Sequence, residues 1–165
     1  MMGAQMEDRA NSRPESVQDV PTCPPQIMTF RVGEQVYGLG ILDVNEIIRY
    51  RSPEFPPGEP KWMLGVIHLR GEILPAVDVR TRLGLPVRTP DPTTVYVVVE
   101  NAGRRMALLV DAVLDVIQIG EDVELEQPPG VDGEASPVAG FVRVGDRTVA
   151  LLKVEAFVPA TEGVA

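Results

Sequence analysis

The chain contains few of the residues that enzymes use for chemistry. Among its 165 residues there is one cysteine, Cys23, and one histidine, His68. A Cys–His pair is not expected, because Cys23 falls in a predicted tail, and a Ser–His–Asp triad would need His68 and a distant serine. Clustered Cys and His ligands for a metal are missing, and so are a Walker-type phosphate loop and a GxGxxG pattern. The sequence therefore predicts no catalytic residues, no metal and no cofactor.

The scarcity of cysteine and of long apolar runs also bears on location. A single cysteine excludes an internal disulfide and fits a reducing compartment. The longest apolar runs, such as residues 95–99 and 106–110, are far too short to span a bilayer, and the first dozen residues lack the apolar core of a signal peptide. We therefore expect a cytoplasmic protein that does not insert directly into a membrane.

Positive charge is the third scarce property. The 15 Lys and Arg residues stand against 24 Asp and Glu residues, which gives a net charge of −9. The negative electrostatic potential of such a chain repels nucleic acid and disfavours binding to an anionic membrane surface. Four of the acids form one run, Glu121, Asp122, Glu124 and Glu126, which we interpret as a solvated surface loop.

The remaining composition predicts one folded unit with short tails. Hydrophobic residues make up 44% of the chain, which is enough for a core. Residues 1–25 are polar and proline-containing and are predicted to be a disordered N-terminal tail. The folded domain is predicted at 26–160, followed by a C-terminal tail at 161–165, with proline-rich loops at 53–60, 86–92 and 128–137.

Between these loops lie eight short runs rich in β-branched and aromatic residues. Short strands at close spacing, separated by turn residues, predict an all-β barrel or sandwich. Residues 41–48, ILDVNEII, are the best helix candidate, because Ile41, Val44, Ile47 and Ile48 have helical spacing. Residues 153–157, KVEAF, are a second short helix candidate.

The chain also resembles itself. Residues 65–79 align without a gap on residues 140–154, and residues 36–44 resemble 105–113 in the same order. This repeat predicts two pseudo-equivalent small β barrels. The alternative is a chance likeness between amphipathic hairpins.

In this alignment Arg70-Gly71 falls opposite Gly145-Asp146, between two strand-like runs in each copy. Both pairs are therefore predicted to be hairpin turns, in which Gly71 supplies a positive φ. An arginine at such a tip, without a partner in its own chain, is free to bind a carboxylate of another protein. Pro75 cannot donate a ladder hydrogen bond, so its strand is expected at a sheet edge or a bulge.

Four segments together resemble the family of CheW-like domains. They are YGLGILDVNEII (37–48), GVIHLRGEILPAVDVRTRLGL (65–85), RMALLVDAVLDVIQI (105–119) and GFVRVGDRTVALLKVEAF (140–157). They occur in the family's order and at its spacing, and the likeness covers about residues 26–158.

The resemblance implies a fold of two SH3-like five-stranded barrels with one or two short helices. It implies a non-catalytic adaptor that couples chemoreceptors to the CheA histidine kinase in signalling arrays beneath the inner membrane. The partners would be the homologous regulatory domain of the kinase and the cytoplasmic tip of a receptor, which docks in the groove between the barrels.

The family's receptor-contact positions match Val44, Glu46, Arg70, Thr94 and Val95 of this sequence. For Val44 and Val95 the alternative is core packing, and for Arg70 it is a solvated turn residue. The resemblance assigns no kinase-contact residues.

Two glycines of the motif, Gly65 and Gly71, match fixed glycines of the family and are assigned structural turns. Asp78 and Arg80 are interpreted as an internal ion pair. His68 stands where the family usually has asparagine, and its effect on partner choice is open.

Two further functions stay open at this point. One is an adaptor for a non-flagellar chemosensory or surface-motility kinase. The other is a small β-barrel enzyme or ligand-binding module, for which His68 would be the only anchor. Without such a role His68 is a strand residue near a turn.

Overall fold

The computed structural model describes residues 23–54, 62–120, 123–127 and 136–158. The C-terminal tail and all of the predicted N-terminal tail except residues 23–25 lie outside these ranges. So do parts of two proline-rich loops, at 55–61 and 128–135, and Glu121 and Asp122 of the acidic run.

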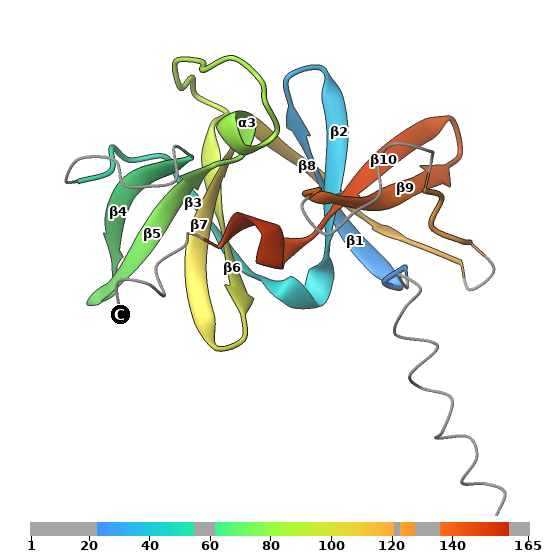
Figure 1. Cartoon of the computed structure of the whole chain (residues 1–165), viewed down its shortest axis with the longest axis horizontal. Coiled ribbons are helices and arrows are strands. Elements are labelled where there is room, and N and C mark those ends of the chain that lie inside the picture. Colours follow the sequence, from blue (N-terminus) through green and yellow to red (C-terminus); the bar gives the residue numbers. More distant parts are fainter. Residues whose placement is uncertain (1–22, 55–61, 121–122, 128–135, 159–165) are drawn as a thin grey trace, which may run out of the picture.

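The described residues form two five-stranded mixed sheets (Figure 1). Sheet A has the order β8 (Ala112–Gln118), β1 (Gln26–Val32), β2 (Gln35–Gly40), β10 (Arg147–Leu152) and β9 (Val138–Val144). Sheet B has the order β3 (Val44–Arg49), β6 (Val95–Asn101), β7 (Arg104–Val110), β5 (Glu72–Asp78) and β4 (Met63–Leu69). Three short helical turns accompany the strands: η1 (Ile41–Asp43) joins β2 to β3, α3 (Val79–Arg82) follows β5, and η2 (Val154–Phe157) follows β10. The predicted all-β class is confirmed.

The internal repeat is confirmed by the topology. β2 and β7 occupy the same place in their sheets, and the hairpin β4–β5 is matched by β9–β10. Each sheet contains one parallel pair, β2 with β10 and β5 with β7. The equivalence extends to two isolated bridges, Glu54 with Val66 and Glu126 with Phe141. Each sheet takes strands from both halves of the chain, so the two barrels are intertwined.

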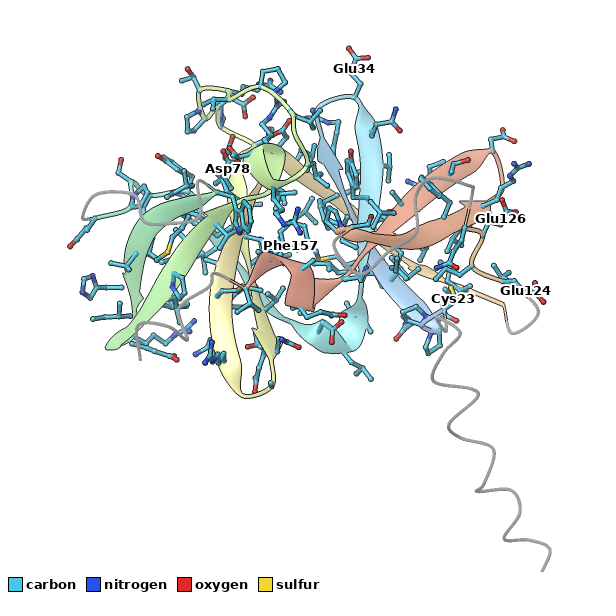
Figure 2. All side chains as sticks on the ribbon, viewed as in Figure 1. Cys23, Glu34, Asp78, Glu124, Glu126 and Phe157 are labelled. Atoms are coloured by element: carbon cyan, nitrogen blue, oxygen red, sulfur yellow. The ribbon has the colours of Figure 1, made fainter. Side chains whose placement is uncertain are left out.

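The hydrophobic core has three parts. The largest lies between the sheets and includes Phe30, Leu39, Val97 and the fully buried Phe157, which Figure 2 shows between the two sheets. A second part lies inside sheet B and a third inside sheet A. The strand β6 serves two of them, because Tyr96 and Val98 face the interior of sheet B while Val97 and Val99 face the shared core. Such a shared core ties the two barrels into one unit.

The helix predicted at 41–48 is wrong. Only Ile41–Asp43 is helical, as a 3₁₀ turn, and Val44–Arg49 is the edge strand β3, paired with β6. A register shift between Val44 and Glu46 leaves Asn45 as a bulge residue, yet burial still alternates along β3. The helix-like spacing arose because Ile47, on the outward face, is apolar although 44% of it is exposed.

The second helix candidate is confirmed as the 3₁₀ turn η2. Sequence reasoning missed α3, a helix of only four residues. Asp78 begins it as an N-cap, because its carboxylate accepts hydrogen bonds from the Arg80 amide at 3.2 Å and from the Thr81 hydroxyl at 2.8 Å.

Two expectations around β5 are corrected. Asp78 and Arg80 are not an ion pair, because the Arg80 guanidinium binds Asp111 with Nη2–Oδ2 at 2.8 Å. β5 is not an edge strand, since it lies between β7 and β4. Pro75 is nevertheless tolerated, because only Ala76–Asp78 of β5 pair with β7 and the proline precedes that stretch.

The described end of the N-terminal segment packs on sheet A. Pro25 accepts a hydrogen bond from the Ile119 amide at 2.8 Å, Cys23 packs on the core of sheet A, and a Cβ placed on Gly40 would lie 3.1 Å from the Pro24 ring. We propose that the folded domain begins at Cys23 and not at residue 26.

Deleting residues 1–22 is expected to leave Tm unchanged within a few degrees, because that stretch offers little apolar surface. Deleting residues 1–25 should lower Tm clearly further, because it removes the Pro25 acceptor and two packed side chains. Thermal unfolding of both deletions tests this, and equal melts would show that residues 23–25 contribute nothing.

Candidate binding surface

The turn between β4 and β5 holds the arginine that the sequence singled out. Leu69 and Glu72 pair directly, so Arg70 and Gly71 form a two-residue loop. Both have positive φ, 49° at Arg70 and 82° at Gly71, as a type I′ turn requires. The predicted turn is therefore confirmed. Arg70 occupies a conformation that favours glycine or asparagine, and it shares this positive φ with Ala102, for which φ is 54°.

Arg70 has a partner in its own chain, contrary to expectation. Its Nη1 and Nη2 atoms donate to the two carboxylate oxygens of Glu46 at 2.6 and 2.7 Å. Glu46 lies on β3 and Arg70 at the end of β4, which are the two outer strands of sheet B. Sheet B thus curls until its outer strands meet, and a bond from Arg51 Nη1 to the His68 carbonyl at 2.7 Å joins the same two edges.

A second arginine extends this ion pair into a network. Arg105 on β7 donates from Nη2 to Glu46 at 3.5 Å, from Nε to Asn45 at 3.1 Å, and from Nη1 to Glu72. The hydrogen bond from Arg70 lowers the pKa of Glu46, burial opposes this, and the charges of Arg70 and Arg105 lower the pKa further. Glu46 therefore stays ionised at neutral pH. Sequence reasoning missed Arg105, Asn45 and Glu72, although the Ala102-Gly103 pair just before Arg105 is a turn signal that could have indicated a hairpin end there.

The other proposed receptor residues lie elsewhere. Val44 and Val95 are half-buried and pack on the shared core, and they sit at opposite ends of the β3–β6 ladder. Thr94 is buried, and its hydroxyl accepts a hydrogen bond from the Asp91 amide at 2.9 Å. Of the five residues, the structure brings only Glu46 and Arg70 into direct contact.

The assignment of Gly65 to a turn is wrong, whereas that of Gly71 is right. Gly65 lies within β4 at a register shift opposite β5, with φ of 144°. A Cβ at Gly71 would meet nothing within 4 Å, so the backbone angle and not space is what requires glycine there.

We expect Gly71→Val to destabilise the fold by about 1–2 kcal/mol, because a β-branched residue is strained at positive φ. The matched change Arg70→Asn should not lower stability, since asparagine suits the first position of a type I′ turn. Urea unfolding of both variants measures this, and equal stability of Gly71→Val and wild type would contradict the turn assignment.

His68 is half-exposed, and its Nδ1 lies 3.8 Å from a Glu54 oxygen at the surface. It sits in a solvated edge position and not in a cleft. Among the residues that the structure describes, no group of three His, Cys, Asp or Glu side chains is arranged to hold a metal ion. The described helices include none that is long and apolar enough to cross a membrane.

Two intertwined β barrels that present a charged, exposed ion-pair network define a protein-interaction module. The chain belongs to the family of CheW-like domains, whose model matches residues 26–162. It is 35% identical to the chemotaxis protein CheW of Rhizobium meliloti over 83% of this chain and 89% of that protein. It is 33% identical to a probable chemotaxis protein CheW of Rhizobium etli, with the same coverage.

A solved structure of a CheW protein has the same fold. The crystal structure of the scaffolding protein CheW from Thermoanaerobacter tengcongensis superimposes with a TM-score of 0.71 at 34% identity, over 79% of this chain and 90% of that one. The chain is therefore a chemotaxis adaptor of the CheW type, a non-catalytic scaffold of a signalling complex. The open alternative of an enzyme or a ligand-binding module does not hold.

Proposed function

We propose that the chain binds a chemoreceptor tip and the regulatory domain of a CheA-type histidine kinase at the same time, at receptor arrays on the cytoplasmic side of the inner membrane. Family membership supports the role of an adaptor. The observation that carries the receptor assignment is the Glu46–Arg70 pair. It is exposed, lies at a strained turn, and falls on the positions that the family resemblance assigns to receptor contact.

The ion pair with Glu46 holds the Arg70 guanidinium in a fixed position before a receptor binds. With 67% of its side chain exposed, the guanidinium is held in place by Glu46 while part of its surface faces solvent. A receptor carboxylate that approaches it meets an arginine whose conformational entropy has already been lost. Val44, Thr94 and Val95 lie apart from this contact, and only the family resemblance supports a receptor role for them.

An adaptor of this kind should bind its kinase reversibly. We expect a micromolar Kd for the regulatory domain of the kinase from the same cell, as is common for small, reversible interfaces. Titration calorimetry with that isolated domain measures it. Absence of heat and of co-elution at tens of micromolar would contradict the proposal.

The output of the system, flagellar or surface motility, is a separate prediction. An adaptor of a non-flagellar chemosensory kinase would use the same surfaces. Co-purification from the native cell distinguishes the two, because the kinase that is captured identifies the pathway.

A further inference from the structure

The ion pair between Glu46 and Arg70 lies against a third charged side chain, Arg105, to which the family resemblance assigns no role. Each guanidinium nitrogen of Arg105 meets a different acceptor. Nε donates to the Asn45 side-chain oxygen at 3.1 Å, Nη2 lies 3.5 Å from a Glu46 oxygen, and Nη1 donates to Glu72. Only 26% of the Arg105 side chain is exposed, against 67% for Arg70. Arg105 is thus occupied within its own chain, whereas Arg70 faces solvent.

A β-bulge helps to bring two of these acceptors to one guanidinium. Successive side chains of a regular strand point to opposite faces, so Asn45 and Glu46 would diverge in such a strand. The register shift between Val44 and Glu46 makes Asn45 a bulge residue, and a bulge re-aims the side chain that it carries. Both side chains therefore reach Arg105.

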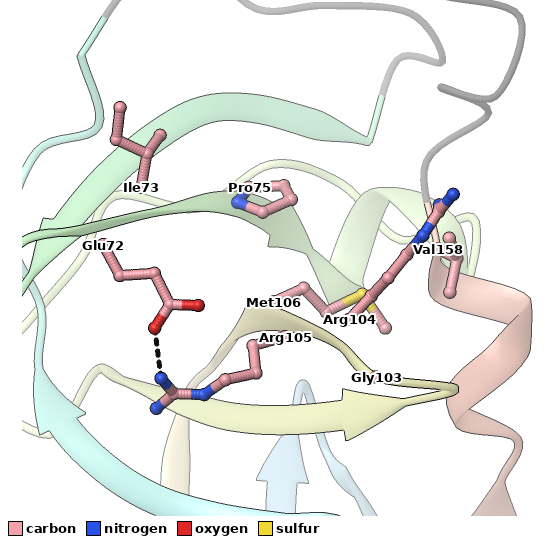
Figure 3. Close-up of a pocket in the computed structure, with 8 residues that line it drawn as sticks. All are labelled: Glu72, Ile73, Pro75, Gly103, Arg104, Arg105, Met106 and Val158. Atoms are coloured by element: carbon pink, nitrogen blue, oxygen red, sulfur yellow. Dashed lines mark hydrogen bonds and ion pairs between the residues drawn. The ribbon is translucent and has the colours of Figure 1, made fainter. Parts of the chain in front are cut away.

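Arg105 also links two strands that the sheet leaves apart. β5 and β7 pair only where Ala76–Asp78 meet Ala107–Leu109, and Pro75, just before that stretch, has no amide hydrogen to extend the pairing. Towards their hairpin turns the strands leave a hollow of about 280 Å³ (Figure 3). Figure 3 shows the contact between Arg105 and Glu72 from one strand to the other. A side-chain contact thus joins the two strands where their ladder has ended.

The network balances two arginines against two carboxylates. Glu46 and Glu72 bind different nitrogens of the Arg105 guanidinium, so these two like charges lie close together. Glu72 is also only two residues from Arg70, on the same hairpin. Without Arg105, the two carboxylates would repel each other, and Glu72 would compete with Glu46 for Arg70. Arg105 removes this competition by binding Glu72.

The internal repeat supplies a comparison within the same molecule. It places Asp115 of β8 at the position of Glu46 and Arg147 of β10 at the position of Glu72. In sheet A these two side chains bind each other directly, with Arg147 Nη2 and Asp115 Oδ2 3.3 Å apart. A single ion pair therefore joins the outer strand β8 to the β9–β10 hairpin.

Sheet A has no counterpart of the two arginines. The repeat places Val36 at the position of Arg105 and Gly145 at the position of Arg70. Linking the outer strand to the hairpin thus does not by itself require Arg105. The residue occurs in the barrel whose turn carries an exposed arginine, which associates its role with Arg70.

We propose that Arg105 is a positioning residue for receptor binding. It holds Glu46 in place and binds Glu72, so Arg70 keeps Glu46 as its partner and presents its guanidinium to the receptor in one orientation. Arg105 itself needs no contact with the receptor. The inference rests on the proposed function, because it concerns how Arg70 meets a receptor carboxylate.

The test compares Arg105→Gln with the double variant that adds Glu72→Gln. Affinity for a receptor-tip fragment is measured by titration, and folding by thermal melts. Arg105→Gln should lower the affinity at least about fivefold, because Arg70 is then shared between two carboxylates. The double variant should recover most of the loss, since Glu46 is again the one carboxylate beside Arg70. An Arg105→Gln variant that is not rescued by Glu72→Gln would overturn the inference.

The matched control is Arg147→Gln, which removes an arginine from the equivalent ion pair of sheet A. It should leave receptor affinity unchanged. An equal loss with Arg147→Gln would assign the effect to the loss of positive charge anywhere on the chain, and would also overturn the inference.

The pKa of the Glu46 carboxyl gives a readout that needs no receptor. The hydrogen bond from Arg70 lowers this pKa, burial opposes it, and the charges of Arg70 and Arg105 lower it further. Arg105→Gln should therefore raise the pKa of Glu46, followed by NMR titration, and Arg147→Gln should not change it. An unchanged pKa in Arg105→Gln would show that Arg105 does not hold Glu46.

Arg70→Gln separates failure of the inference from failure of the proposed function. If Arg105 acts through Arg70, a variant without both arginines should bind the receptor no more weakly than Arg70→Gln alone. A further loss would show that Arg105 contacts the receptor itself and would overturn the positioning role. Wild-type affinity of Arg105→Gln beside a weakened Arg70→Gln would overturn the inference alone. Wild-type affinity of Arg70→Gln would overturn the proposed receptor surface and the inference together.

Discussion

Arg70→Glu is expected to abolish receptor-dependent activation of the kinase while the chain stays folded and still binds the kinase. The side chain is 67% exposed at a hairpin tip, so its replacement leaves the core untouched. The new carboxylate would face Glu46, and it would repel any receptor carboxylate that the guanidinium had bound. We expect receptor affinity to fall by at least about tenfold, as for other interface arginines.

The matched control is the charge swap Glu46→Arg combined with Arg70→Glu. It restores an internal ion pair between the same two positions but presents the charges in reverse. If receptor binding needs Arg70 itself, the swap stays inactive, and its melt matches that of the wild type. Activation measured in a reconstituted receptor–kinase mixture decides this. Wild-type activation by Arg70→Glu would show that Arg70 is only a solvated turn residue.

Asp111→Asn is expected to cause a large loss of stability. Asp111 lies in the connection between β7 of sheet B and β8 of sheet A. Its carboxylate accepts hydrogen bonds from Arg80 Nη2 at 2.8 Å, Arg88 Nη1 at 3.1 Å and the Gly33 amide at 2.8 Å. Because only 13% of the Arg80 side chain is exposed, loss of the carboxylate leaves a poorly solvated guanidinium without its counterion. We expect a cost of about 2–4 kcal/mol.

The matched control is Glu54→Gln at an exposed pair with His68, which should cost less than roughly 1 kcal/mol. Urea unfolding of the two variants gives the comparison. Equal stabilities would show that Asp111 does not hold the sheets together.

The same residue predicts how stability depends on pH. Burial raises the pKa of Asp111, but hydrogen bonds from Arg80 and Gly33 and the charges of Arg80 and Arg88 outweigh it, so the pKa lies below its ordinary value of 3.8. The stabilisation by the ionised carboxylate is then complete above that ordinary value and is lost as the pH falls through the lower pKa of the folded state. Between about pH 5 and about pH 2, Asp111→Asn should lose stability less steeply than the wild type. Parallel slopes would contradict the assignment.

Local signals in the sequence determined the strands, the hairpins and the repeat. Short runs rich in β-branched and aromatic residues, bounded by turn residues, identified eight of the ten described strands, whereas β3 was predicted as a helix and β8 was not predicted. Gly71 and Gly145 identified tight turns, since φ at Gly71 is 82° and at Gly145 is 61°. The repeat and the family motifs then indicated two barrels and an adaptor, and both are confirmed.

Only the tertiary structure decided which strands belong together and which charges meet. The bulged edge strand Val44–Arg49 has the apolar spacing of a helix, and pairing with β6 made it a strand. Glu46 reaches Arg70 across 24 residues because sheet B curls until its outer strands meet, and Arg80 reaches Asp111 across 31 because the chain crosses between the sheets there. No local pattern encodes such contacts, since they follow from how intertwined strands close into barrels.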